Sequence, residues 1–417
     1  MSRRAQNAAG QPISSLMQQA LAHPELISLA AGFVDQASLP VELTSAAATS
    51  LVSDPVRARE ALQYGTAAGH QPLREIVLQR HRNDDGLPAC EDQLSVENVV
   101  LTAGSNQLLH LVADTILNEG DLVLCGAPTY FVFMGALANL GARSHGVACD
   151  DGGLIPEALE DELRRIEAAG ELERVKAIYV VSYFDNPSGI TLAAERRPQI
   201  VEIAKRWSKK QHIYVLDDAA YRSLRYSGED VPSLQAYDET GETVIVAQTF
   251  SKSFSPGIRV GWGILPSALV EPVLNQKGNI DFGSPHFAQH LMAQVLSSGE
   301  FDNHVAVLRE SYREKQTAMI KAAKEFFSSL DGVHYVKPQG GLYLWMQVPE
   351  SIDTGIDGKL FAAALQEGVM YVPGIYCYPM EGAPRRHNLM RLSFGVQTPD
   401  GIQEGMQKLA AAVRQVL

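Results

Sequence analysis

The sequence has no uninterrupted apolar run that approaches the roughly 18 residues needed for a membrane-spanning helix. Its basic N-terminus is followed by polar residues, and not by the apolar core of a signal peptide. Positive charge is also scarce, since 35 Lys and Arg residues face 48 Asp and Glu residues and the net charge is −13. We therefore expect a cytoplasmic protein whose partners include neither a membrane nor a nucleic acid.

Cysteine is rare, and its spacing argues against a metal site. The four cysteines, Cys90, Cys125, Cys149 and Cys377, are far apart and show no paired ligand spacing. Cys125 and Cys149 lie in apolar runs typical of strands, so we expect buried free thiols there. The sequence also has no Gly-x-Gly-x-x-Gly run after a strand. This absence argues against a nicotinamide-dependent dehydrogenase, which the fold class alone would allow.

The chain is long enough for two domains, because 417 residues exceed what one hydrophobic core usually supports. Short β-branched runs alternate with helical patterns such as 105–117 and 192–209, which predicts an α/β fold with a mostly parallel sheet between helices. Seven runs are predicted to be strands: 98–102, 121–125, 142–149, 175–183, 212–216, 243–248 and 259–265.

The pattern changes after residue 284 and predicts a smaller α+β unit. A long amphipathic helix is expected over 301–330, followed by strands at 332–336, 341–345 and 389–393 and helices at 358–367 and 401–416. We therefore expect a large domain at 46–300 and a small domain at 301–417. Residues 1–45 are expected to pack with the small domain or to lie across the entrance to a cleft.

Polar residues follow several of the predicted strands, at the end where α/β sheets bind ligands. Gly104, Ser105 and Asn106 follow the strand 98–102 and begin a helix, and Asn186, Asp218 and Lys252 follow later strands. The last three are 32 and 34 residues apart, about one β-α-β unit each, so they can face one cleft. Each of these residues has a simpler interpretation when it is considered alone: Lys252 is typical of a solvated surface lysine, Asp218 of a helix cap or turn, and Asn186 of a turn. Only their occurrence together, in this order along the chain, indicates a site.

Four segments in this order carry a resemblance to a known family. They are Gln63–Arg74 (QYGTAAGHQPLR), Tyr183–Gly189 (YFDNPSG), Leu216–Tyr221 (LDDAAY) and Thr249–Arg259 (TFSKSFSPGIR). The chain resembles the fold-type I, class I/II pyridoxal-phosphate-dependent aminotransferases from about residue 13 to its C-terminus. It is most similar to the subgroup with 2-aminoadipate and kynurenine aminotransferases and the MocR-type regulators. The resemblance implies a seven-stranded large domain like that of aspartate aminotransferase, with pyridoxal 5'-phosphate as cofactor.

The resemblance assigns the catalytic roles. Lys252 forms a Schiff base with the cofactor, and its freed amine then moves the proton between Cα and the cofactor. Asp218 pairs with the pyridine nitrogen, with Asp217 as its rival; the two should point to opposite faces if the strand continues through them. Tyr221 and Asn186 are expected to hydrogen-bond the phenolic oxygen of the cofactor.

The remaining matches concern the cofactor's ring and phosphate and the substrate. Tyr130 matches the stacking aromatic residue, while Tyr64 matches a tyrosine that reaches the phosphate of a neighbouring subunit and so implies a homodimer with shared active sites. The expected phosphate ligands are Gly104, Ser105, Asn106, Thr249, Ser251 and Arg259. Arg391 matches the arginine that binds the substrate α-carboxylate, Asn186 also lies at the substrate, and Gly32 matches a backbone position beside it.

The expected reaction is transfer of an amino group from an L-amino acid to a 2-oxo acid. A decarboxylase or lyase of the same fold is the alternative, although Arg391 favours cleavage of the Cα–H bond over loss of the carboxylate that it holds. A cofactor-binding regulator is a second alternative.

The substrate is not determined by these motifs. Arg3, Arg4 and His23 are weak candidates for a second cation, and Tyr376 and Tyr378 either line a side-chain pocket or pack in the core. Aromatic, long aliphatic or 2-aminoadipate-like amino acids are preferred.

Overall fold

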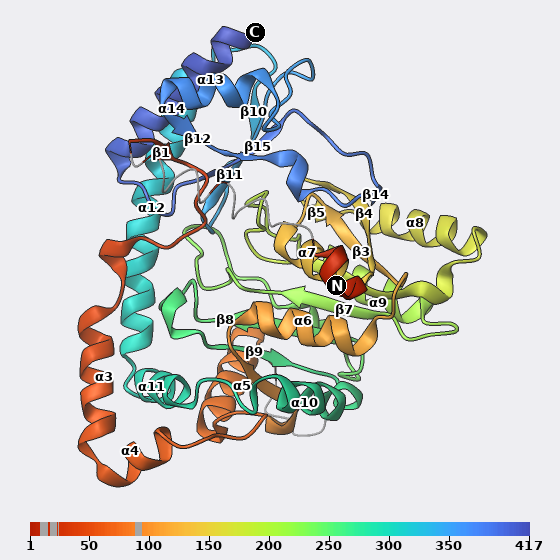
Figure 1. Cartoon of the computed structure of the whole chain (residues 1–417), viewed down its shortest axis with the longest axis vertical. Coiled ribbons are helices and arrows are strands. Elements are labelled where there is room, and N and C mark those ends of the chain that lie inside the picture. Colours follow the sequence, from red (N-terminus) through yellow and green to blue (C-terminus); the bar gives the residue numbers. More distant parts are fainter. Residues whose placement is uncertain (9–15, 17–22, 24, 88–93) are drawn as a thin grey trace.

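The computed structural model describes residues 1–8, 16, 23, 25–87 and 94–417 (Figure 1). Within this part of the chain, no helix combines the length and the apolar character needed to cross a membrane. Cys125, Cys149 and Cys377 are free thiols; Cys125 is buried, as predicted, and so is Cys377, whereas Cys149 is only half-buried, which corrects the prediction for it. Cys90 lies outside the described residues.

A large mixed sheet occupies the centre of the molecule. Its strands run in the order β14-β4-β3-β6-β7-β8-β9-β2, with β5 attached to β4. Neighbours from β14 to β8 are parallel, whereas β9 is antiparallel to both β8 and β2. The strands are β2 Val99–Thr102, β3 Leu122–Ala127, β4 Arg143–Asp150, β5 Gly153–Leu154, β6 Val175–Val181, β7 Tyr214–Asp218, β8 Val244–Thr249, β9 Gly261–Ile264 and β14 Glu381–Gly382. The predicted α/β fold is confirmed, because its seven strands are all present and only the two-residue β5 and β14 are added.

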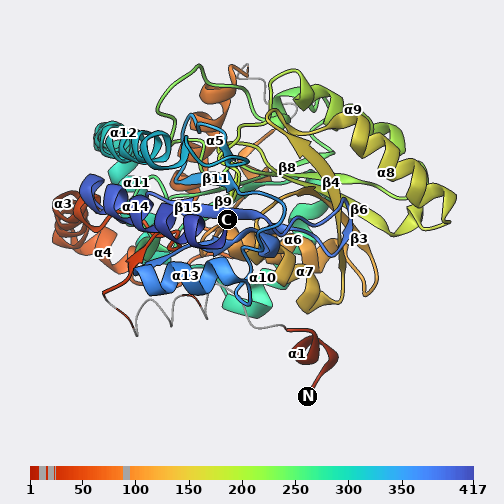
Figure 2. The same ribbon diagram turned by 90° about the horizontal axis from the view of Figure 1, so that it is seen from above.

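Side chains along the strands alternate between two hydrophobic cores, one on each face of the sheet. Val123, Ala177 and Ile245 pack on one face with α6 (Ser105–Ile116), α7 (Phe131–Leu140) and α10 (Ser267–Asp281). Their neighbours Leu124 and Ile178 pack on the other face with α5 (Gln71–Asp85), α8 (Pro156–Ala168), α9 (Arg196–Trp207) and α11 (His286–Ser297). Figure 2 shows these two helix layers on either side of the sheet. The side chains of consecutive residues in one strand therefore point to opposite faces of the sheet.

The C-terminal part builds a second sheet, of order β10-β11-β15-β13, in which all neighbours are antiparallel. Its elements are α12 Glu300–Phe327, β10 His334–Tyr335, β11 Tyr343–Gln347, α13 Lys359–Glu367, β12 Val369–Met370, β13 Val372–Pro373, β15 Leu389–Ser393 and α14 Pro399–Val416. The predicted α+β character of this part is confirmed. Its core also contains Leu29 and Ala30, and β1 (Ile27–Ser28) pairs with β12. The division of the chain into residues 1–45, 46–300 and 301–417 stays a prediction.

The remaining helices of the described residues lie toward the N-terminus, and six short 3₁₀ turns connect other elements. They are α1 Arg3–Asn7, α3 Val41–Ser53 and α4 Pro55–Ala61, with 3₁₀ turns at Gln36–Ser38, Val96–Asn98, Leu172–Arg174, Leu234–Tyr237, Pro256–Ile258 and Gly374–Cys377. Figure 1 shows α3 and α4 along one edge of the molecule, beside α12 and α11.

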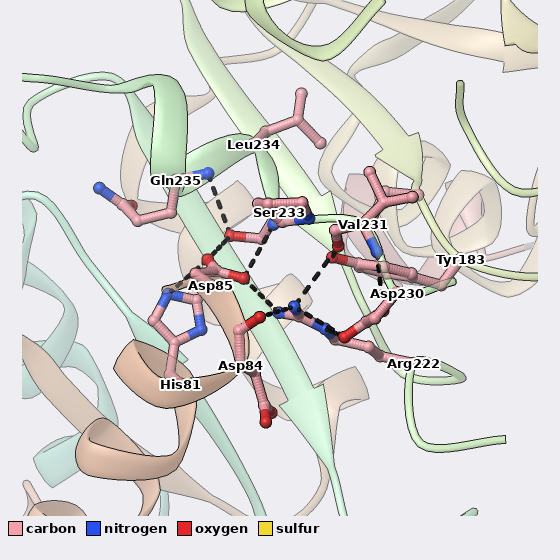
Figure 3. Close-up of polar contacts among 12 residues, drawn as sticks. His81, Asp84, Asp85, Tyr183, Arg222, Asp230, Val231, Ser233, Leu234 and Gln235 are labelled. Atoms are coloured by element: carbon pink, nitrogen blue, oxygen red, sulfur yellow. Dashed lines mark hydrogen bonds and ion pairs between the residues drawn. The ribbon is translucent and has the colours of Figure 1, made fainter. Parts of the chain in front are cut away.

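A buried polar network ties the end of α5 to the loop that follows β7 (Figure 3). Arg222 Nη1 donates to Asp85 Oδ1 at 2.5 Å, and the Ser233 backbone N–H donates to the same oxygen at 2.9 Å. The Asp85 side chain is fully buried and that of Arg222 is 5 % exposed. His81 Nε2 lies 3.4 Å from Asp85 Oδ2. Because breaking a buried ion pair leaves an uncompensated charge, this network holds the residues next to Arg222 firmly in place.

His81 makes stability depend on pH. Burial lowers the pKa of its imidazole from 6.5 to about 4, although Asp85 acts in the opposite direction. Between these values the unfolded chain binds a proton that the folded chain does not, so stability is present above about pH 6.5 and is lost as the pH falls toward 4. We expect His81 to account for a loss of about 2 kcal/mol in the free energy of unfolding between pH 7.5 and pH 5.

Urea unfolding of the wild type and of His81→Gln at these two pH values measures this effect. The variant should lose that part of the pH dependence, while His334→Gln, which changes an exposed histidine, should keep it. An unchanged pH dependence in His81→Gln would contradict the assignment.

Candidate active site

A cavity of about 170 Å³ lies at the carboxyl ends of β6, β7 and β8. Ten of the residues expected at the site line it: Ser105, Asn106, Tyr130, Asn186, Asp218, Tyr221, Thr249, Ser251, Lys252 and Arg259. Val181, Ala220 and Pro256 complete the lining. Gly104, Gly32 and Arg391 contact residues of this cavity, whereas Tyr64 lies apart from it on the surface. The parallel strands thus bring together residues that are up to 154 positions apart in the sequence, from Ser105 to Arg259.

Lys252 lies in the turn after β8, and its amine points toward the N-terminal segment. Lys252 Nζ donates to the Gly32 carbonyl at 2.9 Å and lies 5.9 Å from the centre of the Tyr221 ring. Burial lowers the pKa of the amine; Tyr343 opposes this effect, and the positive charge of Arg391 adds to it. A lowered pKa increases the fraction of neutral amine, which is the nucleophilic form.

Asp217 and Asp218 point to opposite faces of the sheet. Asp218 lies on the face of α6 and α7, where Tyr179 OH donates to its Oδ2 at 2.8 Å and the Ala220 backbone N–H donates to its Oδ1 at 3.2 Å. Burial raises the pKa of the Asp218 carboxyl to about 6, against the effect of the Tyr179 hydrogen bond. Asp217 instead accepts hydrogen bonds from Ser182 Oγ and from the Leu234 backbone N–H. Only Asp218 therefore offers its carboxylate to the cavity.

Tyr343 is a residue of this site that sequence reasoning missed. Its hydroxyl lies 3.1 Å from that of Tyr221, and its ring lies 4.4 Å from Arg391 Cζ. A Cβ atom at Gly32 would approach the Tyr343 hydroxyl to 2.6 Å, so the absence of a side chain at position 32 allows this contact. Tyr343 falls within the predicted strand 341–345, where every neighbouring residue is also apolar or aromatic, and the pattern gave no signal for it. Tyr179 was missed for the same reason.

Arg391 is a buried arginine whose guanidinium faces Asn186. Its Nη1 donates to Asn186 Oδ1 at 2.7 Å and its Nη2 donates to the Ala30 carbonyl at 2.8 Å. The side chain is almost fully enclosed, and Nε has no hydrogen-bond partner among the described residues. A buried cation whose donors are held by neutral oxygens suits an anionic ligand, because a carboxylate would supply the charge that these partners lack.

The start of α6 and the segment after Lys252 form an anion-binding corner. Arg259 Nη2 donates to the Ala103 carbonyl at 2.8 Å, and its Nη1 donates to Ser251 Oγ at 3.3 Å. Gly104 has a φ of +84°, and a Cβ atom there would lie 2.3 Å from Arg259 Nη2, so only glycine fits. The free backbone N–H groups at the start of α6, two hydroxyls and one guanidinium are thus within reach of one ligand.

Two aromatic residues expected at the site differ in position. Tyr130 immediately precedes α7, lines the cavity and donates to Asn106 Oδ1 at 3.4 Å. Tyr64 is 78 % exposed, and its ring packs against that of Phe282 at a centroid distance of 5.4 Å. In one chain, therefore, Tyr64 does not take part in the cavity.

The residues considered for the substrate side chain lie elsewhere. Arg3 and Arg4 pair with Glu119 and Asp114 on the surface, and His23 pairs with Glu25. Tyr376 is half-buried against the core of the C-terminal sheet, while Tyr378 lines a second cavity of about 570 Å³ that also includes Asp185, Trp345 and Arg386. This larger cavity shares Val181 with the first, but no lysine lines it.

Comparison with known proteins decides the family. The family model described as aminotransferase class I and II matches residues 24–409. The chain belongs to this family. It is 32 % identical to aromatic-amino-acid aminotransferase 1 of Thermococcus litoralis, over 94 % of this chain and 88 % of that protein. HTH-type transcriptional regulators also match, over 85 or 86 % of the chain, as the resemblance to MocR-type regulators predicts.

Solved structures of aminotransferases agree with this assignment. The kynurenine aminotransferase of Pyrococcus horikoshii, solved in complex with PMP, gives a TM-score of 0.91 at 30 % identity and covers all of this chain and 97 % of its own. LysN, the alpha-aminoadipate aminotransferase of Thermus thermophilus, was solved with N-(5'-phosphopyridoxyl)-L-leucine and gives a TM-score of 0.85 at 28 % identity over the same shares. The aminotransferase is therefore a pyridoxal-phosphate-dependent enzyme, and the predicted family, activity and cofactor are confirmed.

Proposed function

We propose that the cavity at the ends of β6, β7 and β8 is where this aminotransferase holds pyridoxal phosphate, with Lys252 as its covalent anchor. One observation carries the proposal: a lysine amine, a buried carboxylate and an anion-binding corner line a single cavity. These are the three groups that the cofactor's aldehyde, ring nitrogen and phosphate require. The residues present therefore fit this cofactor.

The anion-binding corner would hold the phosphate. The N-terminus of α6 offers the helix dipole and the backbone N–H groups of Ser105 and Asn106, whereas the Gly104 N–H already donates to the Thr102 carbonyl at 2.8 Å. Arg259 adds a fixed positive charge, and Thr249 and Ser251 add hydroxyl donors. The Arg259 guanidinium is already held by the Ala103 and Pro256 carbonyls, so little further ordering is needed when an anion binds.

Asp218 would hold a proton on the ring nitrogen. The two hydrogen bonds that it accepts come from neutral donors, Tyr179 and the Ala220 backbone, so a positive partner in the cavity would stabilise its ionised form. Tyr221 and Asn186 are placed to bind the phenolic oxygen, and Tyr130 to contact the ring. When bound, the cofactor supplies an electron sink for the substrate Cα.

Lys252 would bind the cofactor and, once released, would move the proton of the substrate Cα. Two buried lysines of the chain provide a contrast. Lys277 pairs with Asp281 at 3.0 Å and Lys315 pairs with Asp35 at 3.1 Å, so each has a carboxylate partner. Among the described residues, the one hydrogen-bond partner of Lys252 is the neutral Gly32 carbonyl, and burial favours its neutral amine.

Arg391 would bind the α-carboxylate and orient the substrate for transamination. Two parallel hydrogen bonds from a guanidinium fix the plane of a carboxylate, and this leaves the Cα–H bond free to face Lys252. Asn186, which now accepts from Arg391 Nη1, would lie beside the bound carboxylate. The same contact disfavours loss of the carboxylate.

For the substrate, we propose an aromatic, long aliphatic or 2-aminoadipate-like L-amino acid. The names of the similar proteins refer to aromatic amino acids, kynurenine and alpha-aminoadipate. The cations considered for an acidic side chain, Arg3, Arg4 and His23, are all exposed and paired with acidic residues. This favours an uncharged or long side chain over a short acidic one.

A half-reaction tests function and substrate together. Purified enzyme is mixed with phenylalanine, leucine, kynurenine, 2-aminoadipate or aspartate, and the absorption band of the bound cofactor is followed. We expect conversion to the aminated form with the first four, reversal by a 2-oxo acid, and the weakest response with aspartate. Release of carbon dioxide without reversal would instead indicate a decarboxylase.

We also propose a homodimer with shared active sites. Large apolar side chains are exposed along α3 and α4, in the loop after α4 and at the C-terminal end of α10, whose Phe282 packs on Tyr64: Val41, Val52, Val56, Leu62, Tyr64, Ile280 and Phe282. Such a concentration on one edge of the molecule is typical of a protein interface. Tyr64 would then reach the phosphate of the partner's cofactor. The cytoplasmic location expected from the sequence stays a prediction.

A further inference from the structure

Three imidazoles gather outside the cavity, where α5 and α11 meet. His70 immediately precedes α5, His286 is the first residue of α11, and His290 follows one turn later. One nitrogen from each of the three rings lies within 4.8 Å of the other two. Figure 1 shows α5 and α11 side by side, and none of the three histidines lines the cavity around Lys252.

Hydrogen bonding fixes which nitrogen of His286 is free. His286 Nδ1 lies 3.0 Å from the Gln63 carbonyl, which can only accept, so Nδ1 carries the proton and the lone pair is on Nε2. That Nε2 atom lies 3.2 Å from His290 Nε2. Two nitrogens at 2.0–2.1 Å from a tetrahedral zinc ion are separated by about 3.3 Å, so this spacing fits a shared metal ion. A backbone carbonyl on the second nitrogen is also the usual partner of a metal-binding histidine.

The third imidazole is held close to the other two. The His70 ring stacks on that of His290 with centroids 3.7 Å apart. The His70 backbone N–H donates to Gln289 Oε1 at 2.7 Å, which ties the residue to α11. These contacts hold a His70 ring nitrogen within 4.8 Å of a ring nitrogen of His286 and of His290.

The loop before α5 closes against the cluster. A Cβ atom at Gly65 would lie 2.6 Å from His286 Cδ2, so the glycine allows the loop to contact the ring. The same loop supplies the Gln63 carbonyl that orients His286. Tyr64 lies between these two residues. An ion bound by the three imidazoles would therefore join α5, α11 and this loop.

We propose that His70, His286 and His290 bind one divalent transition-metal ion, such as Zn²⁺, with water as the fourth ligand. Three imidazoles suit zinc and its neighbours in the first transition series, whereas Mg²⁺ and Ca²⁺ require oxygen ligands. The site lies outside the cofactor cavity, and the ion is not needed for the proposed chemistry. Its effect is to cross-link three segments of the fold.

Titration of untagged holoenzyme with Co²⁺, without amino acid, tests the site. We expect the visible d–d bands of a tetrahedral ion to saturate at about one Co²⁺ per chain, and Zn²⁺ to displace them. Equilibrium dialysis with Zn²⁺ gives the affinity. His290→Ala and His70→Gln should each weaken Zn²⁺ binding by at least about tenfold, because each removes one of three protein ligands.

Two controls keep the outcome clear. His387→Ala removes an exposed histidine outside the cluster and should bind Zn²⁺ as the wild type does. Zn²⁺ should raise the unfolding temperature of the wild type but not that of His70→Gln, whose half-buried side chain is easier to replace than buried His290. Failure of the wild type to give the tetrahedral spectrum, or equal Zn²⁺ affinity in wild type and both cluster variants, would overturn the proposal. Mg²⁺ should have no effect.

Discussion

Lys252→Ala is expected to lower kcat by at least about 10³-fold, because the variant loses both the covalent anchor and the group that moves the Cα proton. The phosphate corner at Gly104, Ser251 and Arg259 remains, so the cofactor should still bind without a covalent link. Steady-state kinetics and the absorption of the bound cofactor measure the two effects separately. A drop in kcat with cofactor retained is the expected pattern.

Lys337→Ala, which changes an exposed lysine, is the control for general effects of losing a positive charge. Retained turnover in Lys252→Ala would show that another lysine performs the chemistry.

Mixing inactive Lys252→Ala with Tyr64→Ala further tests the shared site. A hybrid dimer then has one site with both native residues, so about a quarter of wild-type activity should return. If each chain forms its own complete site, mixing should restore nothing.

Asp218→Asn is expected to lower kcat by about 10²–10³-fold, because the amide cannot balance a positive charge on the ring nitrogen. Asparagine preserves the size of the side chain; its one oxygen can accept from the Ala220 backbone N–H, and its amide NH2 can donate to the Tyr179 hydroxyl. We therefore expect the unfolding temperature to change little. The pH dependence of the cofactor's absorption should shift, because the ring nitrogen loses the charge that keeps it protonated.

Asp217→Asn provides a matched comparison one residue away. Asp217 accepts from Ser182 and from the Leu234 backbone on the opposite face of β7, so its replacement should cost about 1–3 kcal/mol in the free energy of unfolding. Its kcat should stay within a few-fold of that of the wild type. The reverse pattern, with activity lost at Asp217 and kept at Asp218, would exchange the two roles.

The sequence predicted the central sheet well because each strand is a short apolar run between helical patterns, and a mostly parallel arrangement follows from that alternation. It also predicted that Asp217 and Asp218 face opposite sides, since side chains alternate along a strand. The two-residue β5 and β14 could not be predicted, because so few residues carry no periodic signal. β14 adds Glu381 to the edge of a sheet whose other strands end more than 100 positions earlier.

The parts of the site that escaped prediction depend on pairing between distant segments. Tyr179 reaches Asp218 because β6 and β7 are paired with Val181 opposite Asp218, a register that the sequence does not display. Tyr343 enters the site from β11 of the four-stranded sheet and contacts Gly32 and Tyr221, which lie 311 and 122 positions before it. The histidine cluster was missed because its members are 216 and 4 positions apart.

The buried ion pair between Arg222 and Asp85 has a consequence for how the enzyme tolerates change. Arg222 follows Tyr221 directly, so a single peptide bond joins a residue of the cavity to a charge locked against the end of α5. A substitution that loosens α5 therefore shifts Tyr221 as well. In this region, mutations that change the stability of the fold therefore also change catalytic activity. Selection on one of these two properties then alters the other.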